Sequence, residues 1–266
     1  MKRTIKEIVF SEQELAEARM LKDRLVAALK NFFRSAGKKN AVVGLSGGVD
    51  SATVCGLLAE ALGPKQVFAY YLPVDNDAQD GKDAANVAKQ FKANFKTINL
   101  KPLVNSACKL LGAKDKVGRG NLSARMRMVV LYQLARKHNA LVTGTGNRTE
   151  LLLGYFTKYG DGGADVLPLG DLYKTQVWAV ASVLGVPKEV IAKKPSAGLW
   201  RGQTDEGELG MSYGELDLAL QGLFDRKKNE RELNRLVGAA KVKRVSQLFN
   251  SSSHKRSPPF VLKVRG

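Results

Sequence analysis

The sequence has little cysteine and no long apolar run. Its 266 residues include 2 cysteines, Cys55 and Cys108, which fall in expected helices at no metal-like spacing. Such cysteines favour buried free thiols in a reducing cytoplasm over a disulfide framework or a zinc site. No stretch approaches the roughly 18 apolar residues of a membrane span, and the apolar segment 8–10 is too short for the core of a signal peptide. We therefore expect a cytoplasmic protein.

Acidic residues are scarce relative to basic ones. The chain has 43 Lys and Arg against 25 Asp and Glu, a formal net charge of +18. From Arg226 to Gly266 there are 12 basic and 2 acidic residues, so the last 41 residues carry +10 of this excess. A basic surface can attract nucleic acid, an anionic membrane or anionic small molecules. Few aromatic residues lie among these charges to stack bases. We therefore keep a solvated surface without a specific partner as an equal alternative, and expect neither a nucleic-acid nor a membrane partner.

Apolar periodicity predicts an α/β fold. After the capping-box sequence 11–14, apolar residues recur every three or four positions and predict a long helix that ends near Gly37. Short apolar strands then alternate with helices. The expected strands are 41–45, 66–72, 95–99 and 140–143, and the expected helices are 52–62, 81–91, 103–111 and 121–139. This order predicts one domain over residues 1–266, a doubly wound parallel sheet with helices on both faces, and ligands at the carboxyl ends of the strands.

A glycine-rich turn follows the first expected strand. Its residues are Gly44, Leu45, Ser46, Gly47, Gly48, Val49, Asp50 and Ser51. Paired glycines let backbone N–H groups approach an anion, and the helix that follows adds unpaired N–H donors and a positive dipole end, so the turn suits a polyphosphate. It lacks the lysine of the common G-x-x-x-x-G-K-[ST] phosphate loop and carries Asp50 instead, which calls for Mg²⁺ between the carboxylate and the phosphates. The alternative is a simple turn in which the aspartate caps a helix.

A second turn, 143–150, follows the expected strand 140–143 and ends in Glu150. Parallel strands bring their carboxyl ends to one edge, so Glu150 can face Asp50. Two carboxylates from different loops suit Mg²⁺ that also bridges phosphate oxygens. The alternative for Glu150 is an ordinary position on a helix face.

Two segments are expected to be mobile. The lid segment, 196–210, is rich in glycine and has little apolar periodicity, so it is either a lid over the nucleotide or a plain surface loop. The tail segment, 250–266, contains a serine run at 251–253 and prolines at 258–259.

The motif S-G-G-V-D-S at 46–51 resembles that of the N-type ATP pyrophosphatases, which cleave ATP between the α and β phosphates and transfer AMP. The later run F-T-K-Y-G-D-G-G-A-D at 156–165 resembles the ammonia-dependent NAD⁺ synthetase family within that group. This resemblance extends over nearly the whole chain. It implies an adenine-nucleotide alpha-hydrolase-like, Rossmann-like fold.

The resemblance also assigns roles by position. It implies that ATP binds to 44–51 together with Thr145, Lys174 and Ser196. Deamido-NAD⁺ would contact Arg125, Lys158, Asp165, His254 and Lys255, and Mg²⁺ would bind Asp50 and Glu150. Asp50, Lys174 and Asp165 are the catalytic candidates, and Asp165 or Asp205 is a candidate to take a proton from ammonium.

The implied enzyme is a ligase that forms a carbon–nitrogen bond. It would amidate deamido-NAD⁺ with ATP and free ammonia through an adenylated nicotinate, release AMP and pyrophosphate, and act as a homodimer. Whether a separate glutaminase supplies the ammonia is left open. Two alternatives remain: an ATP pyrophosphatase that adenylates a tRNA base, and a nonenzymatic adenine-nucleotide sensor on the same fold.

Overall fold

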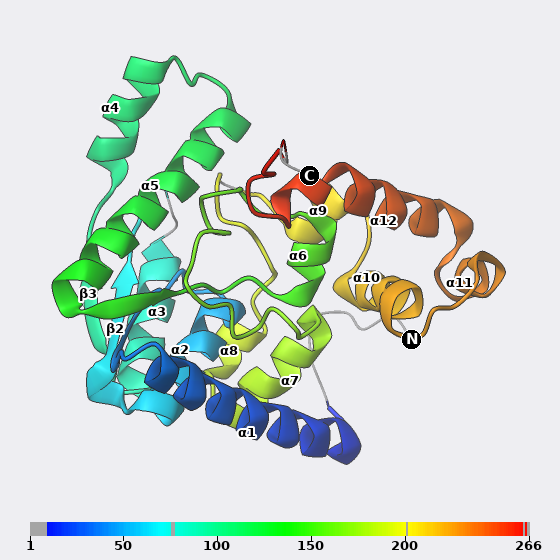
Figure 1. The fold of residues 1–266 in the computed structure, drawn as a ribbon, viewed down its shortest axis with the longest axis horizontal. Coiled ribbons are helices and arrows are strands. Elements are labelled where there is room, and N and C mark those ends of the chain that lie inside the picture. Colours follow the sequence, from blue (N-terminus) through cyan, green and yellow to red (C-terminus); the bar gives the residue numbers. More distant parts are fainter. Residues whose placement is uncertain (1–9, 76–77, 201, 263, 265–266) are drawn as a thin grey trace.

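The fold is built on a parallel sheet of four strands in the order β3-β2-β1-β4, with β2 and β3 labelled at the left of Figure 1. The computed structural model describes residues 10–75, 78–200, 202–262 and 264. The strands are β1 Asn40–Gly44, β2 Val67–Tyr71, β3 Asn94–Thr97 and β4 Ala140–Thr143. All three pairings are parallel, so every strand ends at the same edge of the sheet.

The core lies on both faces of this sheet because successive strand residues point to opposite sides. In β1, Ala41 and Val43 belong to one buried apolar cluster, and Val42 between them belongs to another. All three side chains are fully buried. A strand that is apolar on both faces is typical of a parallel sheet covered by two layers of helices.

One layer contains α1, α2, α3 and α7, and the other contains α4 and α5. Their bounds are α1 Glu12–Ser35, α2 Val49–Leu62, α3 Ala78–Gln90, α4 Lys101–Leu111, α5 Lys116–His138 and α7 Lys174–Leu184. Helix α2 is buried along most of its length because its sequence is largely alanine, valine, leucine and cysteine. The short helix α6, Arg148–Leu153, follows β4.

The C-terminal part packs beside α6 and α7. It comprises α8 Lys188–Ile191, α9 Asp205–Leu209, α10 Tyr213–Leu220, a π-helical turn Gln221–Asp225, α11 Glu230–Val237, α12 Ala239–Ser251 and a 3₁₀ turn Ser253–Lys255. In the part of the chain that the structure describes, no helix combines the length and the apolar character needed to cross a membrane.

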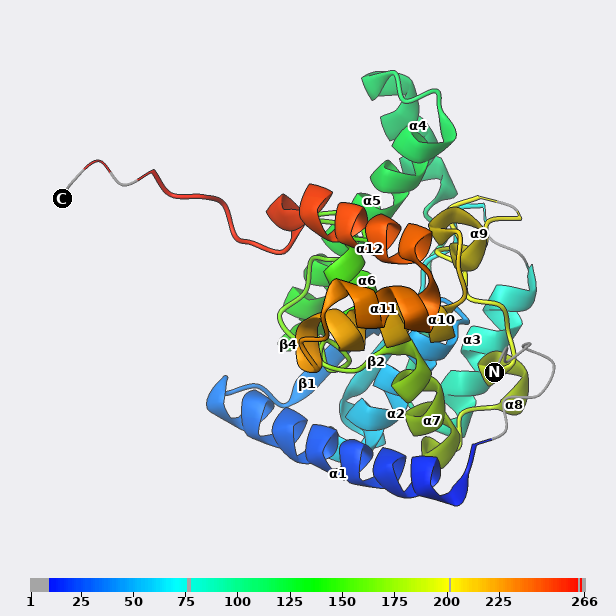
Figure 2. The same cartoon turned by 90° about the vertical axis from the view of Figure 1, so that its right-hand side faces the viewer.

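The helical hairpin of α4 and α5 projects from the body at the end formed by α4 and the start of α5, whereas the rest of α5 packs on β1 and β4 (Figures 1 and 2). Six large apolar side chains of this hairpin are at least one-third exposed. They are Leu103, Leu110, Leu111, Val117, Val129 and Tyr132. Figure 2 also shows the chain after α12 leading away from the body, and Phe260 there is 88% exposed.

The predicted α/β fold, the parallel sheet and the order of strands and helices are confirmed. Four helices begin earlier than predicted: α2 at Val49 rather than residue 52, α3 at Ala78 rather than 81, α4 at Lys101 rather than 103, and α5 at Lys116 rather than 121. The early start of α5 follows from Asp115, whose carboxylate accepts a hydrogen bond from the Gly118 N–H and caps the helix.

The two segments expected to be mobile contain regular structure. Helix α9 lies inside the lid segment, and the tail segment begins within the last turn of α12. Residue 201 of the lid segment and residues 263, 265 and 266 of the tail segment lie outside the described residues. Mobility of both segments stays a prediction.

Candidate active site

A cavity of about 1070 Å³ opens at the carboxyl edge of the sheet. The turns after β1 and β4 line it, together with residues 193–200, 202, 203 and 205. Strands of a parallel sheet place their following loops at this edge, which explains why segments distant in sequence meet here.

The turn after β1, 44–51, forms a cradle of backbone donors. Gly47 has a φ of +82°, a conformation that L side chains rarely adopt. The Ser46 N–H donates to the Ser51 hydroxyl over 3.1 Å, and the Ser51 hydroxyl donates to the Gly48 carbonyl over 3.0 Å. Gly48 is the N-cap of α2 and has no side chain to satisfy the first N–H groups of that helix. The cradle therefore offers N–H groups and a helix N-terminus to an anion.

Asp50 and Lys174 form a buried ion pair beside this cradle. Asp50 lies in the first turn of α2 and Lys174 is the first residue of α7; their side chains are 18% and 2% exposed. The Asn147 side chain donates to the other oxygen of Asp50 over 3.1 Å. Burial opposes the charge of Lys174, but the carboxylates of Asp50 and Glu150 outweigh it and raise the pKa of this lysine. The lysine therefore stays charged inside the protein.

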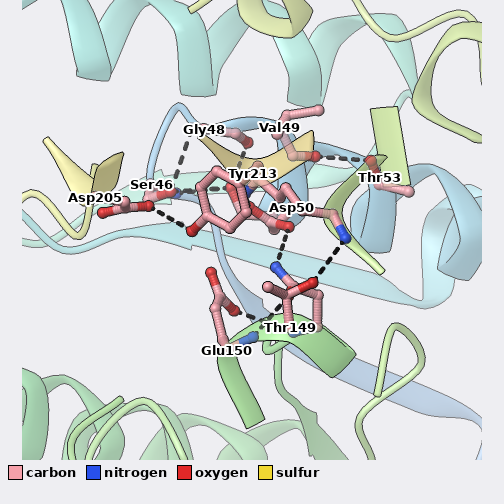
Figure 3. A network of polar contacts seen from close by, with 12 residues as sticks. Ser46, Gly48, Val49, Asp50, Thr53, Thr149, Glu150, Asp205 and Tyr213 are labelled. Atoms are coloured by element: carbon pink, nitrogen blue, oxygen red, sulfur yellow. Dashed lines mark hydrogen bonds and ion pairs between the residues drawn. The ribbon is translucent and has the colours of Figure 1, made fainter. Parts of the chain in front are cut away.

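Glu150 faces the same space from α6 (Figure 3). It forms a capping box with Asn147: the Asn147 N–H donates to Glu150 and the Glu150 N–H donates to the Asn147 side chain, each over 3.0 Å. Burial, reinforced by the neighbouring charge of Asp50, raises the pKa of Glu150 to about 8. The carboxyl groups of Asp50 and Glu150 therefore repel each other in a site that a cation would stabilise.

These carboxylates suit Mg²⁺ better than a metal held by protein alone. Within the described ranges there is no group of three or more His, Cys, Asp or Glu side chains that could hold a metal ion. Asp50 and Glu150 would supply two oxygen ligands, and phosphate oxygens and water would complete an octahedral shell. The residues present fit a Mg²⁺–nucleotide complex.

Asp205 and Tyr213 join this site from the lid segment and α10. The Tyr213 hydroxyl donates to Asp205 over 2.9 Å, and Figure 3 shows the carboxylates of Asp50, Glu150 and Asp205 gathered around Tyr213. Asp205 is 3% exposed, and burial raises its pKa. The Lys174 ammonium lies 5.2 Å from the centre of the Tyr213 ring, a cation–π contact. Nothing in the sequence indicates Tyr213, because its neighbours Ser212, Gly214 and Glu215 belong to no motif of a nucleotide site.

The remaining predicted ATP contacts, Thr145 and Ser196, both border the cavity. The Ser196 hydroxyl accepts a hydrogen bond from the Gly198 N–H over 3.1 Å. Every residue that the sequence predicts for ATP, except Gly47 on the outer side of its turn, borders this cavity.

Most of the predicted dinucleotide contacts lie in a separate group that includes one residue of the cavity wall. The Lys158 ammonium donates to the His254 carbonyl, and Arg125 donates to the Lys158 carbonyl over 3.4 Å. Lys255 alone among these predicted contacts borders the cavity, and its ammonium donates to the carbonyls of Gly154 and Phe156.

Asp165 does not border the cavity. Its carboxylate accepts a hydrogen bond from the Val142 N–H over 2.7 Å and another from the Tyr132 hydroxyl over 3.2 Å. In this arrangement Asp165 connects its loop to β4 through the hydrogen bond from Val142. Its catalytic role stays a prediction.

The raised pKa of Glu150 predicts a pH-dependent stability. A carboxyl whose pKa rises on folding favours the folded state fully below its ordinary value of 4.5, and this contribution is lost as pH rises from there to about 8. Glu150→Gln removes the charge and keeps an oxygen for the Asn147 N–H. In urea unfolding without nucleotide or Mg²⁺, we expect the variant to match the original near pH 4 and to exceed it at pH 8, by on the order of 1 kcal/mol or more.

Glu17→Gln is the control for this experiment because Glu17 is an exposed residue of α1. The control should show no such trend. A stability difference for Glu150→Gln that stays constant between pH 4 and pH 8 would contradict the prediction.

Comparison with known proteins agrees with the predicted family. The profile of the NAD synthase family matches residues 21–259. The chain is 46% identical over 245 residues to the NH(3)-dependent NAD(+) synthetase of Archaeoglobus fulgidus, which covers 91% of this chain and 96% of that protein. It is 44% identical over 240 residues to the NH(3)-dependent NAD(+) synthetase of Pyrococcus horikoshii, with 89% and 93% covered.

Two solved structures share the fold. The NMN synthetase from Francisella tularensis superimposes with a TM-score of 0.84 at 36% identity, over 96% of this chain and 99% of that one. The NH3-dependent NAD synthetase from Campylobacter jejuni gives a TM-score of 0.80 at 27% identity, over 92% and 99%. With a family match across most of its length and these relatives, the chain belongs to the NAD synthase family.

Proposed function

We propose that this protein amidates deamido-NAD⁺ with ammonia and ATP to give NAD⁺, AMP and pyrophosphate. The observation that carries the proposal is the buried Asp50–Lys174 pair beside a cradle of backbone N–H groups. This places a fixed positive charge where a polyphosphate would lie. The NH(3)-dependent NAD(+) synthetase names of the relatives in Archaeoglobus and Pyrococcus support the substrate.

In the first step, an oxygen of the nicotinate carboxylate would attack the α-phosphorus of ATP. A new P–O bond forms, the bond to the bridging oxygen breaks, and pyrophosphate leaves with that electron pair. Negative charge accumulates on phosphate oxygens, so Lys174 and the N-terminus of α2 would stabilise the transition state by electrostatics and positioning. No protein nucleophile is needed.

Mg²⁺ would be held by Asp50 and Glu150. It supplies charge neutralisation and orientation of the phosphates when bound. Two features support this role: the mutual repulsion of the two carboxylates and the raised pKa of Glu150, which binding of a cation would lower again.

In the second step, ammonia would attack the acyl carbon, form the C–N bond and expel AMP. Ammonium must first lose a proton. Asp205 is better placed than Asp165 to accept it, because Asp205 borders the cavity and burial raises its pKa. We propose free ammonia as the nitrogen source, in the cytoplasm that the two free cysteines favour.

The dinucleotide would extend from the cavity past Lys255, which borders it, to Arg125, Lys158 and His254. Arginine and lysine suit the pyrophosphate and carboxylate of deamido-NAD⁺ as charge-assisted donors. Asp165 would accept a hydrogen bond from a ribose hydroxyl only after releasing Tyr132 or Val142.

We also propose a homodimer that forms through the hairpin of α4 and α5. Leu110 and Leu111 at the end of α4 are 84% and 67% exposed, an unusual cost for a monomer in water. A second copy packed on this hairpin would cover them, and the hairpin carries Arg125, one of the predicted dinucleotide contacts.

Nicotinate mononucleotide is a second candidate substrate. The solved structure of an NMN synthetase from Francisella tularensis, with its TM-score of 0.84, favours it. The chemistry is the same, since both substrates present a nicotinate carboxylate. They differ in the adenylate half, which the predicted dinucleotide contacts would bind.

Purified protein with Mg²⁺, ATP, ammonium and deamido-NAD⁺ should form NAD⁺ and AMP in equal amounts. We expect ammonium to support faster turnover than glutamine and expect kcat/KM for deamido-NAD⁺ to exceed that for nicotinate mononucleotide. Chromatography of the nucleotides measures the product ratio, the preference for ammonium and the order of the two kcat/KM values. A higher kcat/KM for the mononucleotide would transfer the assignment to that substrate, and no AMP with either one would refute the ligase.

Asp50→Asn should reduce pyrophosphate release by at least about 100-fold while the protein remains folded, because the variant loses the charge that holds both Lys174 and Mg²⁺. Circular dichroism checks the fold and a pyrophosphate assay checks the reaction. The matched control is Asp23→Asn, whose side chain is 71% exposed on α1. Near-normal pyrophosphate release in Asp50→Asn would exclude the proposed role.

The dimer proposal predicts a change of mass. Light scattering should give twice the mass of one chain, and the double variant Leu110→Glu/Leu111→Glu should give a monomer at the same micromolar concentration, because two charges would then be buried without partners. Met20→Glu, at a 57% exposed position of α1, is the control and should remain dimeric. A double variant that is still dimeric would exclude this face as the interface.

A further inference from the structure

We propose that Lys193 is a positioning residue for ATP, which fixes the backbone of the phosphate cradle and the start of the lid segment by joining both to α3. The proposal rests on the proposed function, because it takes ATP as the occupant of the cavity. Sequence analysis gave Lys193 no role.

Lys193 has three acceptors for its three donor hydrogens. Its ammonium lies 2.6 Å from an oxygen of Asp80, 2.6 Å from an oxygen of Asp83 and 3.3 Å from the Gly47 carbonyl. Burial opposes its charge, but the hydrogen bonds to the two carboxylates outweigh burial and raise its pKa. A lysine with this set of partners is held in one place.

The contact with Gly47 orients a peptide of the cradle. Carbonyl and N–H groups of a trans peptide point in opposite directions. Because the Gly47 carbonyl turns toward Lys193, the Gly48 N–H turns the other way and donates a hydrogen bond to the Ser46 hydroxyl over 3.2 Å. Ser46 and Gly48 border the cavity and Gly47 does not. Lys193 thus fixes the Gly47–Gly48 peptide in the orientation in which its N–H reaches Ser46, a residue that borders the cavity.

Helix α3 is the base for this contact. A Cβ on Gly47 would come within 2.5 Å of the Asp80 carbonyl, so the cradle already packs tightly against the first turn of α3. Asp83 is 4% exposed, and its second oxygen accepts a hydrogen bond from Gln79 over 2.7 Å. Without Lys193, Asp83 would be a buried carboxylate without its cation, and this turn of α3 would shift or take up water.

The same lysine anchors the start of the lid segment. Ser196, a predicted ATP contact, lies three residues after Lys193, and the Pro195 carbonyl accepts a hydrogen bond from the Asp205 N–H over 3.1 Å. Displacement of Lys193 would therefore move the lid segment and the cradle relative to each other. Displacements of this kind, about 1 Å, can cost about 100-fold in rate.

The test is binding of α,β-methylene-ATP, which cannot release pyrophosphate, measured by calorimetry with Mg²⁺ on the full chain. Lys193→Met should weaken binding about 10- to 100-fold and leave KM for deamido-NAD⁺ within about twofold in turnover assays. Asp83→Asn should weaken binding in the same direction. Lys193→Arg, which can still donate to both carboxylates, should recover most of the affinity.

Lys22→Met is the matched control. Lys22 also pairs with two carboxylates, at 2.6 Å from Glu60 and 3.0 Å from Asp23, and it does not border the cavity. We expect this variant to bind the analogue within about twofold of the original protein. Thermal unfolding of both methionine variants will separate a loss of stability from a loss of affinity.

Two results would overturn the proposal. Unchanged binding by Lys193→Met would show that the lysine does not position the cradle. Tighter binding by Asp83→Asn would show that Lys193 leaves its carboxylates and contacts phosphate itself. A protein that binds the analogue in a Lys193-dependent way and yet forms no NAD⁺ would support this proposal and refute the proposed function.

Discussion

The arrangement of the site depends on the buried ion pair between Asp50 and Lys174. These residues are 124 positions apart in the chain. Asp50 is the second residue of α2, and Lys174 is the first residue of α7. An ammonium that is 2% exposed would be very unfavourable without a fixed anion beside it. The pair therefore sets how the starts of α2 and α7 lie relative to each other. Asn147 adds the turn after β4 to the same junction through its hydrogen bond to Asp50.

Local chemistry made part of this site predictable. Gly47 and Gly48 after an apolar strand indicate an anion-binding turn by themselves, and Glu150 follows from the rule that parallel strands end together. Lys174 gave no local signal, and only its position in a known family pointed to it. Tyr213 and Lys193 gave none either. The roles of Lys174 and Lys193 depend on contacts with Asp50 and Gly47, each more than 100 positions away, and that of Tyr213 depends on its contacts with Asp205 and Lys174. A pattern within one segment does not contain that information.

The fold class and the order of elements were predicted more accurately than the residues at which helices and strands begin and end. Strand β4 has the predicted ends, because the Asn139 backbone is left-handed and separates the strand from α5. The start of α2 was placed too late because glycine and serine discourage a helix locally, whereas Val49 is already helical. Helix α9 was not predicted because it has only five residues, too few for a periodic pattern. Hydrogen bonds from Tyr155 and Tyr213 to its first residue, Asp205, hold it in place.

The ion pair between Asp50 and Lys174 affects how a nucleotide and its metal would bind. Both oxygens of Asp50 are occupied, one by Lys174 and one by Asn147. A divalent cation arriving with a nucleotide would compete with the lysine for the same carboxylate. If Asp50 bound the metal, the Lys174 ammonium would be free to pair with a phosphate oxygen instead. Without a nucleotide, Asp50 therefore keeps Lys174 charged and fixed in place inside the protein, so the positive charge is already in position before the phosphates bind.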